Sequence, residues 1–171
     1  MKFILDNGGL ETYDYRPTIL MRYAEILLIA AETANELVAD GALAPEESKE
    51  YIRMIRQRAE IEEGESNKYG VMDDIKKEDM RKLIQTERQI ELAFEEHRYW
   101  DVRRWKIAKE VLGGPSHGME ITRRVLDDGG ESFSYRRIEV LNHVWDDRLY
   151  WWPVPQSEMS KSGALIQNPG Y

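Results

Sequence analysis

Acidic residues at helical spacing are the clearest chemistry-bearing pattern in this sequence. Glu87, Glu91 and Glu95 follow one another at steps of four, and Arg98 continues the same helical face. Like charges at this spacing repel by about a few tenths of a kcal/mol per pair when exposed. We therefore expect cations to neutralise them in an ion-pair network that fixes helix packing. The candidate cations, on the same helix or on others, are Arg88, Arg98, Arg22, Arg56 and Arg58.

Catalytic roles for these carboxylates would need motifs that the sequence does not contain. A di-iron carboxylate site needs Glu-x-x-His motifs on facing helices, and none precedes His97, His117 or His143. A glycoside hydrolase needs two carboxylates about 5 to 9.5 Å apart across a cleft, and no pair stands out among 32 acidic residues. Neither a Gly-x-Ser-x-Gly elbow nor a phosphate-binding Gly-x-x-x-x-Gly-Lys loop occurs. We predict no catalytic residue, no metal site and no cofactor.

Aromatic residues gather in two places. Tyr99, Trp100 and Trp105 form one group, and the other is near the end of the chain, at Trp145, Tyr150, Trp151 and Trp152. Aromatic faces stack on sugar rings and mark binding surfaces, although most aromatic side chains serve packing. A short basic run is interpreted as a packing or salt-bridge feature because its surroundings are acidic; it comprises Arg103, Arg104 and Lys106.

Composition narrows the class of protein. The chain has 171 residues, which fits one domain or a large piece of one, and it has no cysteine for disulfides or thiolate metal sites. A net charge of −8 argues against nucleic-acid binding. No apolar run reaches the roughly 18 residues of a transmembrane helix. Asp6, Gly8 and Gly9 lie where a signal peptide has its apolar core. We expect either a cytoplasmic protein or a targeting segment upstream of this chain.

The elements that must position these groups are mainly helices. Residues 1–16 are turn-rich and predict a loop or arm. A first helix is expected over residues 18–39, ended by Asp40-Gly41. Its apolar residues cover nearly every face, which predicts a central, buried helix. The apolar residues that recur at three- and four-residue steps are Leu20, Ala24, Leu27, Leu28, Ala31, Ala34 and Val38.

A second helix should begin at Pro45 and pair with the first in an antiparallel hairpin, because the connection is short. Residues 61–73 predict a loop, and a third helical region is expected over 74–112 with a bend at 98–100. Gly113-Gly114-Pro115 ends it. The inner stripe expected of the second helix is Ser48, Tyr51, Ile52, Ile55 and Ala59.

The last third of the sequence has a different pattern. Asp127-Asp128-Gly129-Gly130 predicts a hairpin turn. A short strand with a slip in its alternation should follow it over residues 133–140. Residues 149–152 are predicted to be extended, and residues 167–171 hold a Pro-Gly turn.

Five stretches, in this order, resemble the C-terminal block of the SusD/RagB family over about residues 17–171. In the second stretch, Met54 and its neighbours depart from the family's usual Asn-containing lead-in. The matching stretches are Arg22-Tyr23-Ala24-Glu25 with Leu27-Leu28, Ala31-Glu32 and Asn35-Glu36; Ile55-Arg56-Gln57-Arg58-Ala59; residues 87–95 with Arg98-Tyr99-Trp100-Asp101 and Arg103-Arg104-Trp105; Trp152-Pro153-Val154-Pro155; and residues 167–171.

This resemblance implies a mainly α, tetratricopeptide-related fold. It consists of a helical hairpin and a further long helix, with a small β-ribbon and long loops near the C-terminus. The family-like domain would occupy residues 17–171, without the family's N-terminal repeat half. The resemblance further implies a non-catalytic surface lipoprotein of the outer membrane of Bacteroidetes-type bacteria. Such proteins capture oligosaccharides or peptides for a SusC-like TonB-dependent transporter. Family ligand contacts lie largely upstream of this block, so the ligand-binding residues of this chain stay unknown.

Three functions therefore remain open. The first is a binding module for oligosaccharides. The second is a structural scaffold that contacts the transporter and the missing repeats, which predicts self-association or an exposed apolar patch on the first helix. A glycoside hydrolase is the remote third.

Overall fold

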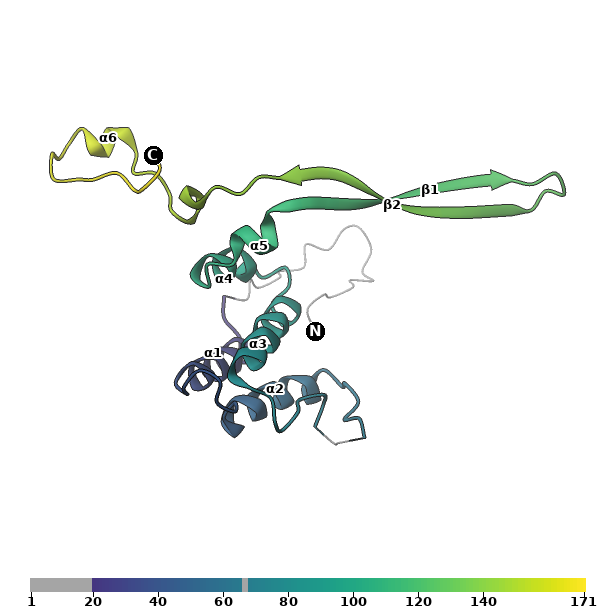
Figure 1. The fold of residues 1–171 in the computed structure, drawn as a ribbon, viewed down its shortest axis with the longest axis horizontal. Helices are drawn as coiled ribbons and strands as arrows, with labels where there is room; N and C mark the ends of the chain where they lie inside the picture. Colours follow the sequence, from purple (N-terminus) through teal and green to yellow (C-terminus); the bar gives the residue numbers. More distant parts are fainter. Residues whose placement is uncertain (1–19, 66–67) are drawn as a thin grey trace, which may run out of the picture. The chain divides into compact units, whose positions relative to one another are not determined.

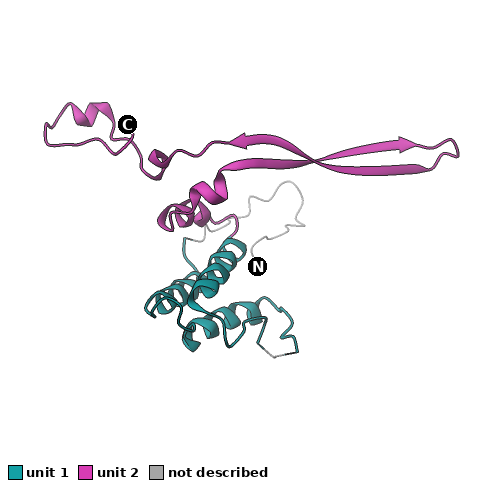
Figure 2. Ribbon diagram, viewed as in Figure 1, with its two compact units in different colours: residues 1–92 teal, residues 93–171 magenta. Residues whose placement is uncertain are grey.

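The computed structural model describes residues 20–65 and 68–171, so the arm predicted over residues 1–16 lies outside the described residues. The chain divides into two compact units (Figure 2). The first unit comprises residues 1–92 and the second residues 93–171. Within the described residues the architecture is mainly helical with one two-stranded sheet (Figure 1), as predicted. No helix in this part of the chain is both long and apolar enough to cross a membrane.

Three helices form the first unit. They are α1 (Tyr23–Glu36), α2 (Glu46–Arg58) and α3 (Lys77–Glu91), and α1 packs against both of the others. Leu28, Ile52 and Met80, one from each helix, are fully buried between them. The hairpin of α1 and α2 and the loop over residues 61–65 and 68–73 confirm the predictions.

Helix α1 differs from its prediction in length and burial. It begins at Tyr23, because residues 20–22 are not helical, and it stops at Glu36, three residues early, where the Lys77 ammonium binds the chain beyond its end. Lys77 Nζ donates to the Val38 carbonyl at 2.7 Å and to the Asp40 carboxylate at 2.9 Å. The expectation of burial on every face is wrong for the described residues: α2 and α3 cover only part of the helix. The apolar residues left exposed on and before α1 are Leu20, Met21, Tyr23, Ile26 and Ile29.

Helix α2 begins at Glu46, one residue later than predicted, with Pro45 as its N-cap. Ser48, Ile52 and Ile55 are buried, but Ala59 is exposed as the C-cap. Lys49 is also buried, which the pattern did not indicate; its ammonium donates to the Asp73 carbonyl at 2.6 Å. This hydrogen bond holds the loop before α3 against α2.

The third helical region is interrupted, and the single bend predicted at 98–100 is wrong. Residues 92–96 form turns after α3, with Phe94 and Glu96 in the left-handed region. A left-handed residue ends a helix because the hydrogen-bond ladder cannot continue through it. The chain then forms α4 (His97–Arg104) and α5 (Ala108–Leu112). The first helix of this region, α3, starts at Lys77 and not at residue 74, because Lys76 forms a β-bridge with Leu43.

Two long strands follow, β1 (Gly114–Val125) and β2 (Glu131–His143). They pair as an antiparallel ribbon longer than the predicted strand. The predicted turn is confirmed: the Gly129 amide donates to the Leu126 carbonyl at 2.9 Å, and Gly129 has φ +80°. The predicted slip is a bulge at Val140, whose methyl lies 2.8 Å from where a Cβ on Gly118 would be.

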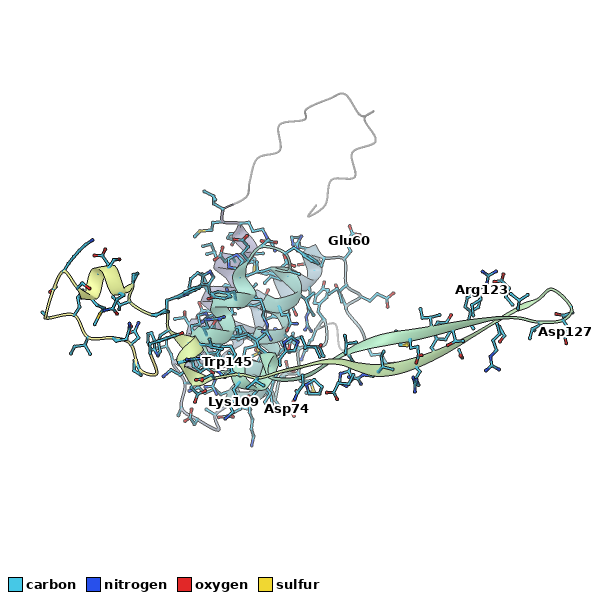
Figure 3. All side chains as sticks on the ribbon, turned by 90° about the horizontal axis from the view of Figure 1, so that it is seen from above. Glu60, Asp74, Lys109, Arg123, Asp127 and Trp145 are labelled. Atoms are coloured by element: carbon cyan, nitrogen blue, oxygen red, sulfur yellow. The ribbon has the colours of Figure 1, made fainter. Side chains whose placement is uncertain are left out.

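The two faces of the ribbon differ in polarity. Strand alternation and register place Ile121 and Tyr135 opposite each other on one face, and Thr122 and Ser134 on the other. Figure 3 shows side chains standing free along the ribbon up to Asp127 at its tip. One face carries five exposed apolar residues, Met119, Ile121, Val125, Phe133 and Tyr135, together with the charged residues Arg123, Glu131 and Arg137. The other carries Glu120, Thr122, Arg124, Ser132, Ser134 and Arg136.

The C-terminal segment contains two short helices, η1 (Asp147–Tyr150) and α6 (Gln156–Met159). The prediction of an extended chain from residue 149 is wrong at Leu149 and Tyr150, which lie in the 3-10 helix η1. The Asp146 side chain caps this helix and supplies the local hydrogen bond that favours it. The Pro-Gly turn is confirmed: the Tyr171 amide donates to the Asn168 carbonyl at 3.3 Å and Gly170 has φ +89°.

Candidate functional site

The predicted ion-pair network is present in the first unit. Glu87 on α3 accepts hydrogen bonds from Arg56 Nε at 3.0 Å and Nη2 at 2.9 Å. Glu91 accepts one from Arg58 at 2.7 Å and another from Arg22. Both carboxylates are nearly buried, at 8% and 10% side-chain exposure. The arginines come from α2 and from the residue before α1, so these acids join three helices.

Glu95 does not lie on α3 with Glu87 and Glu91. The helix ends at Glu91, so Glu95 falls in the turns that follow. The ladder of three acids predicted on one helical face is therefore two acids on a helix and one beyond it. Arginines bind both Glu87 and Glu91, so the two acids on the helix serve in packing.

A second ion pair perturbs titration at the surface of the same unit. Arg81 on α3 donates to both carboxylate oxygens of Glu36 at 2.7 and 2.6 Å. This hydrogen bonding from Arg81 holds the pKa of Glu36 below its ordinary value. The charge of Lys77 acts in the same direction.

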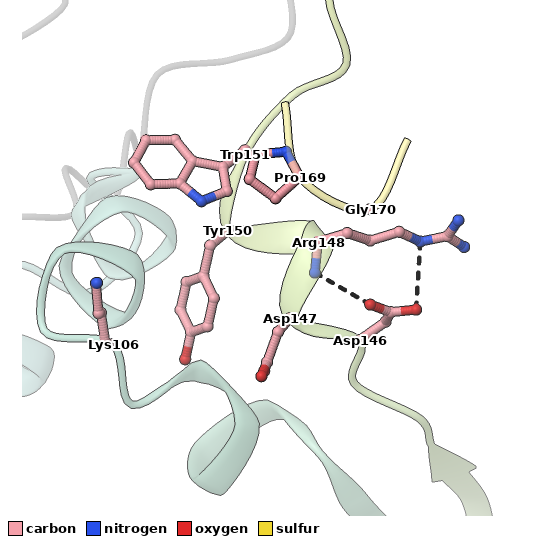
Figure 4. Close-up of a pocket in the computed structure, with 8 residues that line it drawn as sticks. All are labelled: Lys106, Asp146, Asp147, Arg148, Tyr150, Trp151, Pro169 and Gly170. Carbon is pink, nitrogen blue, oxygen red and sulfur yellow. Dashed lines mark hydrogen bonds and ion pairs between the residues drawn. The ribbon is translucent and has the colours of Figure 1, made fainter. Parts of the chain in front are cut away.

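The second unit contains an open pocket that we call the C-terminal pocket (Figure 4). Its volume is about 510 Å³, within the range of about 300–1,000 Å³ usual for small-molecule sites. It combines aromatic rings with charged side chains. The lining residues are Lys106, Asp146, Asp147, Arg148, Tyr150, Trp151, Pro169 and Gly170.

Helix η1 forms one wall of this pocket and is fixed by Asp146. One oxygen of the Asp146 carboxylate accepts from the Arg148 backbone amide at 3.0 Å. The other oxygen lies 3.4 Å from Arg148 Nε, and Figure 4 marks both contacts. Both oxygens of Asp146 therefore serve the local structure.

The Pro-Gly turn at the C-terminus also lines the pocket and packs directly against η1. A Cβ on Gly170 would lie 2.7 Å from the Arg148 Cβ, so only glycine allows this close approach. The Tyr171 hydroxyl donates to the Trp151 carbonyl at 3.2 Å. Residues about twenty positions apart are thus held together around the pocket.

The terminal aromatic residues divide into packed and exposed rings. Tyr150 makes an edge contact with Trp145, with ring centroids 5.1 Å apart. The Arg103 guanidinium lies 3.5 Å from the centre of the Tyr99 ring and 5.5 Å from that of Trp145. Trp151 is 54% exposed at the pocket. This is the arrangement expected of a stacking surface held by packed neighbours.

Two charged groups at the pocket have no side-chain partner among the described residues. Asp147 is exposed at the start of η1, and Lys106 is exposed at a left-handed position after α4. In Figure 4 the Tyr150 ring lies between these two residues. The pocket thus offers an acceptor, a donor and aromatic surface, which suits a ligand with many hydroxyl groups.

Sequence reasoning identified the aromatic residues but not the role of Asp147 or Lys106. The basic run serves mainly in packing, as predicted: Arg104 pairs with Asp101 at 2.9 Å and Arg103 stacks on Tyr99. Lys106 departs from that role and lines the pocket. The signal available was the Asp146-Asp147 pair before an aromatic run, since Asp is a usual helix cap.

Comparison with known proteins gives a consistent result. The whole sequence, residues 1–171, matches the SusD family. It is 32% identical over 167 residues to the SusD-like protein P2 of Formosa agariphila, covering 97% of this chain and 28% of that protein. The SusD-like protein P38 of the same organism is 35% identical over 105 residues, which are 59% of this chain and 19% of that protein.

A solved structure supports the fold. The crystal structure of a SusD-like protein from Bacteroides fragilis is 36% identical, with a TM-score of 0.67 over 90% of this chain and 26% of that one. This chain thus spans about a quarter of the length of the relatives it matches. With a match over its full length and these relatives, the chain belongs to the SusD family.

Proposed function

We propose that this chain is part of a non-catalytic nutrient-binding protein that captures oligosaccharides at the cell surface for a SusC-like TonB-dependent transporter. SusD-family proteins are in general nutrient- or glycan-binding components of the outer membrane. The observation that carries the proposal for this chain is the C-terminal pocket, with a half-exposed indole beside hydrogen-bonding groups. Aromatic surface with a few convergent polar groups is the usual composition of a binding site for small molecules.

The charged motif of α3 supports the non-catalytic part of the proposal. Glu87 and Glu91 are neutralised by arginines of other elements. A general acid or a nucleophile needs a carboxylate that can reach a substrate and exchange a proton with it. These two carboxylates instead connect helices.

Isothermal calorimetry on this chain tests the proposal directly. We expect at least one neutral oligosaccharide in a panel to bind, with no reducing sugar released on prolonged incubation. Short peptides serve as the competing class of ligand. Preferential binding of peptides would contradict the oligosaccharide assignment, and release of reducing sugar would support the remote alternative of a glycoside hydrolase.

The exposed apolar surface of α1 favours a second candidate, a structural scaffold. Ile26 and Ile29 are each 44% exposed on a helix whose other face is fully packed. A pocket of about 380 Å³ with Leu27, Met54 and Ile55 in its lining lies beside this helix. In this reading the block contacts the transporter and the family's repeat half without binding ligand itself.

Sedimentation of the chain over a range of concentrations distinguishes the scaffold from the binding module. A scaffold with an uncovered face should self-associate, and Ile26→Glu with Ile29→Glu should abolish the association. A monomer at all concentrations that binds oligosaccharide would favour the binding module.

A further inference from the structure

We infer that the C-terminal pocket is a subsite for one neutral ring-form sugar unit, with the Trp151 indole as its stacking surface and the Asp147 carboxylate as the acceptor for two neighbouring hydroxyls. This inference rests on the proposed function and adds the residues and the chemical feature that they recognise. All the residues involved lie in the second unit.

The two adjacent aspartates of the pocket have different roles. Asp146 is occupied on both oxygens, by the Arg148 amide and by the Arg148 side chain. Asp147 has no side-chain partner among the described residues and is exposed. A carboxylate with two open oxygens accepts hydrogen bonds from two adjacent hydroxyls, in the way it accepts a two-pronged donor. Asp147 is therefore the residue that can receive a vicinal diol.

Charge balance favours a neutral ligand. Arg148 and Asp146 form an ion pair within the wall. Asp147 and Lys106 are left with opposite signs. Asp147 would repel an anionic ligand, and Lys106 would repel a cationic one. The hydroxyls of a neutral sugar can donate to Asp147 and accept from Lys106, which satisfies both groups.

The pocket walls do not depend on the side chains that would touch the sugar. Trp151 is tied by its backbone, because its amide donates to the Arg148 carbonyl at 3.0 Å and its carbonyl accepts from the Tyr171 hydroxyl. Gly170 sets the approach of the turn to Arg148. Replacing the Trp151 indole or one Asp147 oxygen should therefore leave the backbone of the pocket in place.

The neighbouring Trp152 provides a matched control. It is 70% exposed but does not line the pocket. The Asn168 side chain donates to its backbone carbonyl at 2.6 Å, a contact that an alanine variant keeps. Trp151→Ala and Trp152→Ala thus remove the same side chain from adjacent positions.

Calorimetry on the 171-residue chain tests the subsite. The probes are neutral hexasaccharides (malto-, cello-, xylo- and manno-series), trigalacturonate as an anionic probe and tetra-alanine as a peptide. With the hexasaccharide that binds best, we expect Trp151→Ala to weaken binding by at least about tenfold. Asp147→Asn, which replaces a charged acceptor with a neutral one, should weaken it by about tenfold. Trp152→Ala should stay within about twofold.

The outcomes separate this inference from the proposed function. Binding that survives both pocket substitutions within about twofold would overturn the subsite and leave oligosaccharide capture standing. Tighter binding of trigalacturonate, lost in Lys106→Ala, would overturn the neutral-sugar assignment. Absence of binding to every probe would overturn both. Fluorescence of the tryptophans that remain in each variant, all of which lie in the second unit, shows whether that unit keeps its fold before binding is compared.

Discussion

The two units of this chain are built on different principles. In the first, apolar side chains from three helices meet in one buried cluster, and ion pairs at its border join α2 and the start of α1 to α3. In the second, the buried apolar residues among those described are Val102 and Ala108. Its order comes from ladder hydrogen bonds, helix caps and turn residues. The comparison shows one unit held by packing and another held by local backbone geometry.

The ribbon is the extreme case of the second principle. An isolated two-stranded hairpin is marginally stable at best in water, and this one leaves apolar residues such as Ile121 and Tyr135 exposed. Its register is nevertheless well defined by the Gly129 turn and the bulge at Val140. Local turn chemistry can thus specify a strand pairing that no core supports.

Truncating one apolar residue in each unit should give the largest difference in the free energy of unfolding. Leu28→Ala empties a fully buried position of α1 and should lower the free energy of unfolding by about 2 to 5 kcal/mol. Ile121→Ala on the ribbon should change it by less than about 0.5 kcal/mol, because Ile121 is 58% exposed. Urea unfolding measures both, followed by far-UV circular dichroism for Leu28→Ala and by tryptophan fluorescence for Ile121→Ala, because the tryptophans lie in the unit that holds the ribbon. An equal loss in the two variants would show that Ile121 is covered.

The ion-pair network should have the next largest effect. Glu91→Ala leaves two arginines without their common carboxylate and should cost about 3 kcal/mol, at the low end for breaking a buried pair because Arg58 is largely exposed. Asp79→Ala on the same helix removes an exposed pair with Lys82 and should cost less than about 1 kcal/mol. Urea unfolding of both variants decides this. A loss below about 1 kcal/mol for Glu91→Ala would make it a surface charge.

The smallest effect concerns pH and the Glu36–Arg81 pair. Because the folded-state pKa of Glu36 is lowered, its contribution to stability is full above the unfolded-state value of about 4.3. That contribution disappears as the pH falls through the lower, folded-state value. Arg81→Met should therefore reduce stability at pH 7 slightly and flatten the loss between about pH 5 and pH 3. Thermal unfolding of both proteins across this range measures the difference; parallel curves would show that the pair contributes nothing.

Sequence patterns predicted the first unit better than the second because packing leaves a periodic signal. Ser48, Ile52 and Ile55 are spaced for one helical face and are buried on it. Arginines were also expected to neutralise Glu87 and Glu91, because repelling charges on a helix need partners. The hairpin turn was readable for a similar reason, since Gly129 supplies the left-handed conformation that the turn requires.

The errors arose where single backbone conformations decide the structure. Phe94 and Glu96 adopt left-handed angles that neither residue type favours, and they break the helical region. Lys106 does the same and so becomes part of the pocket. That Lys106 and Asp147 line the same pocket depends on tertiary arrangement, which periodicity does not report. The ligand residues proposed here could therefore not be assigned from the sequence.

The placement of the aromatic residues has a spectroscopic consequence. The five tryptophans, at positions 100, 105, 145, 151 and 152, all belong to the second unit. Intrinsic tryptophan fluorescence therefore observes only that unit, whereas the far-UV signal is dominated by helices, the longest of which lie in the first. Two probes present in the unmodified protein thus report on different halves of the chain. Coincident unfolding curves would show that the halves melt as one cooperative system, and separate curves would give each half its own stability.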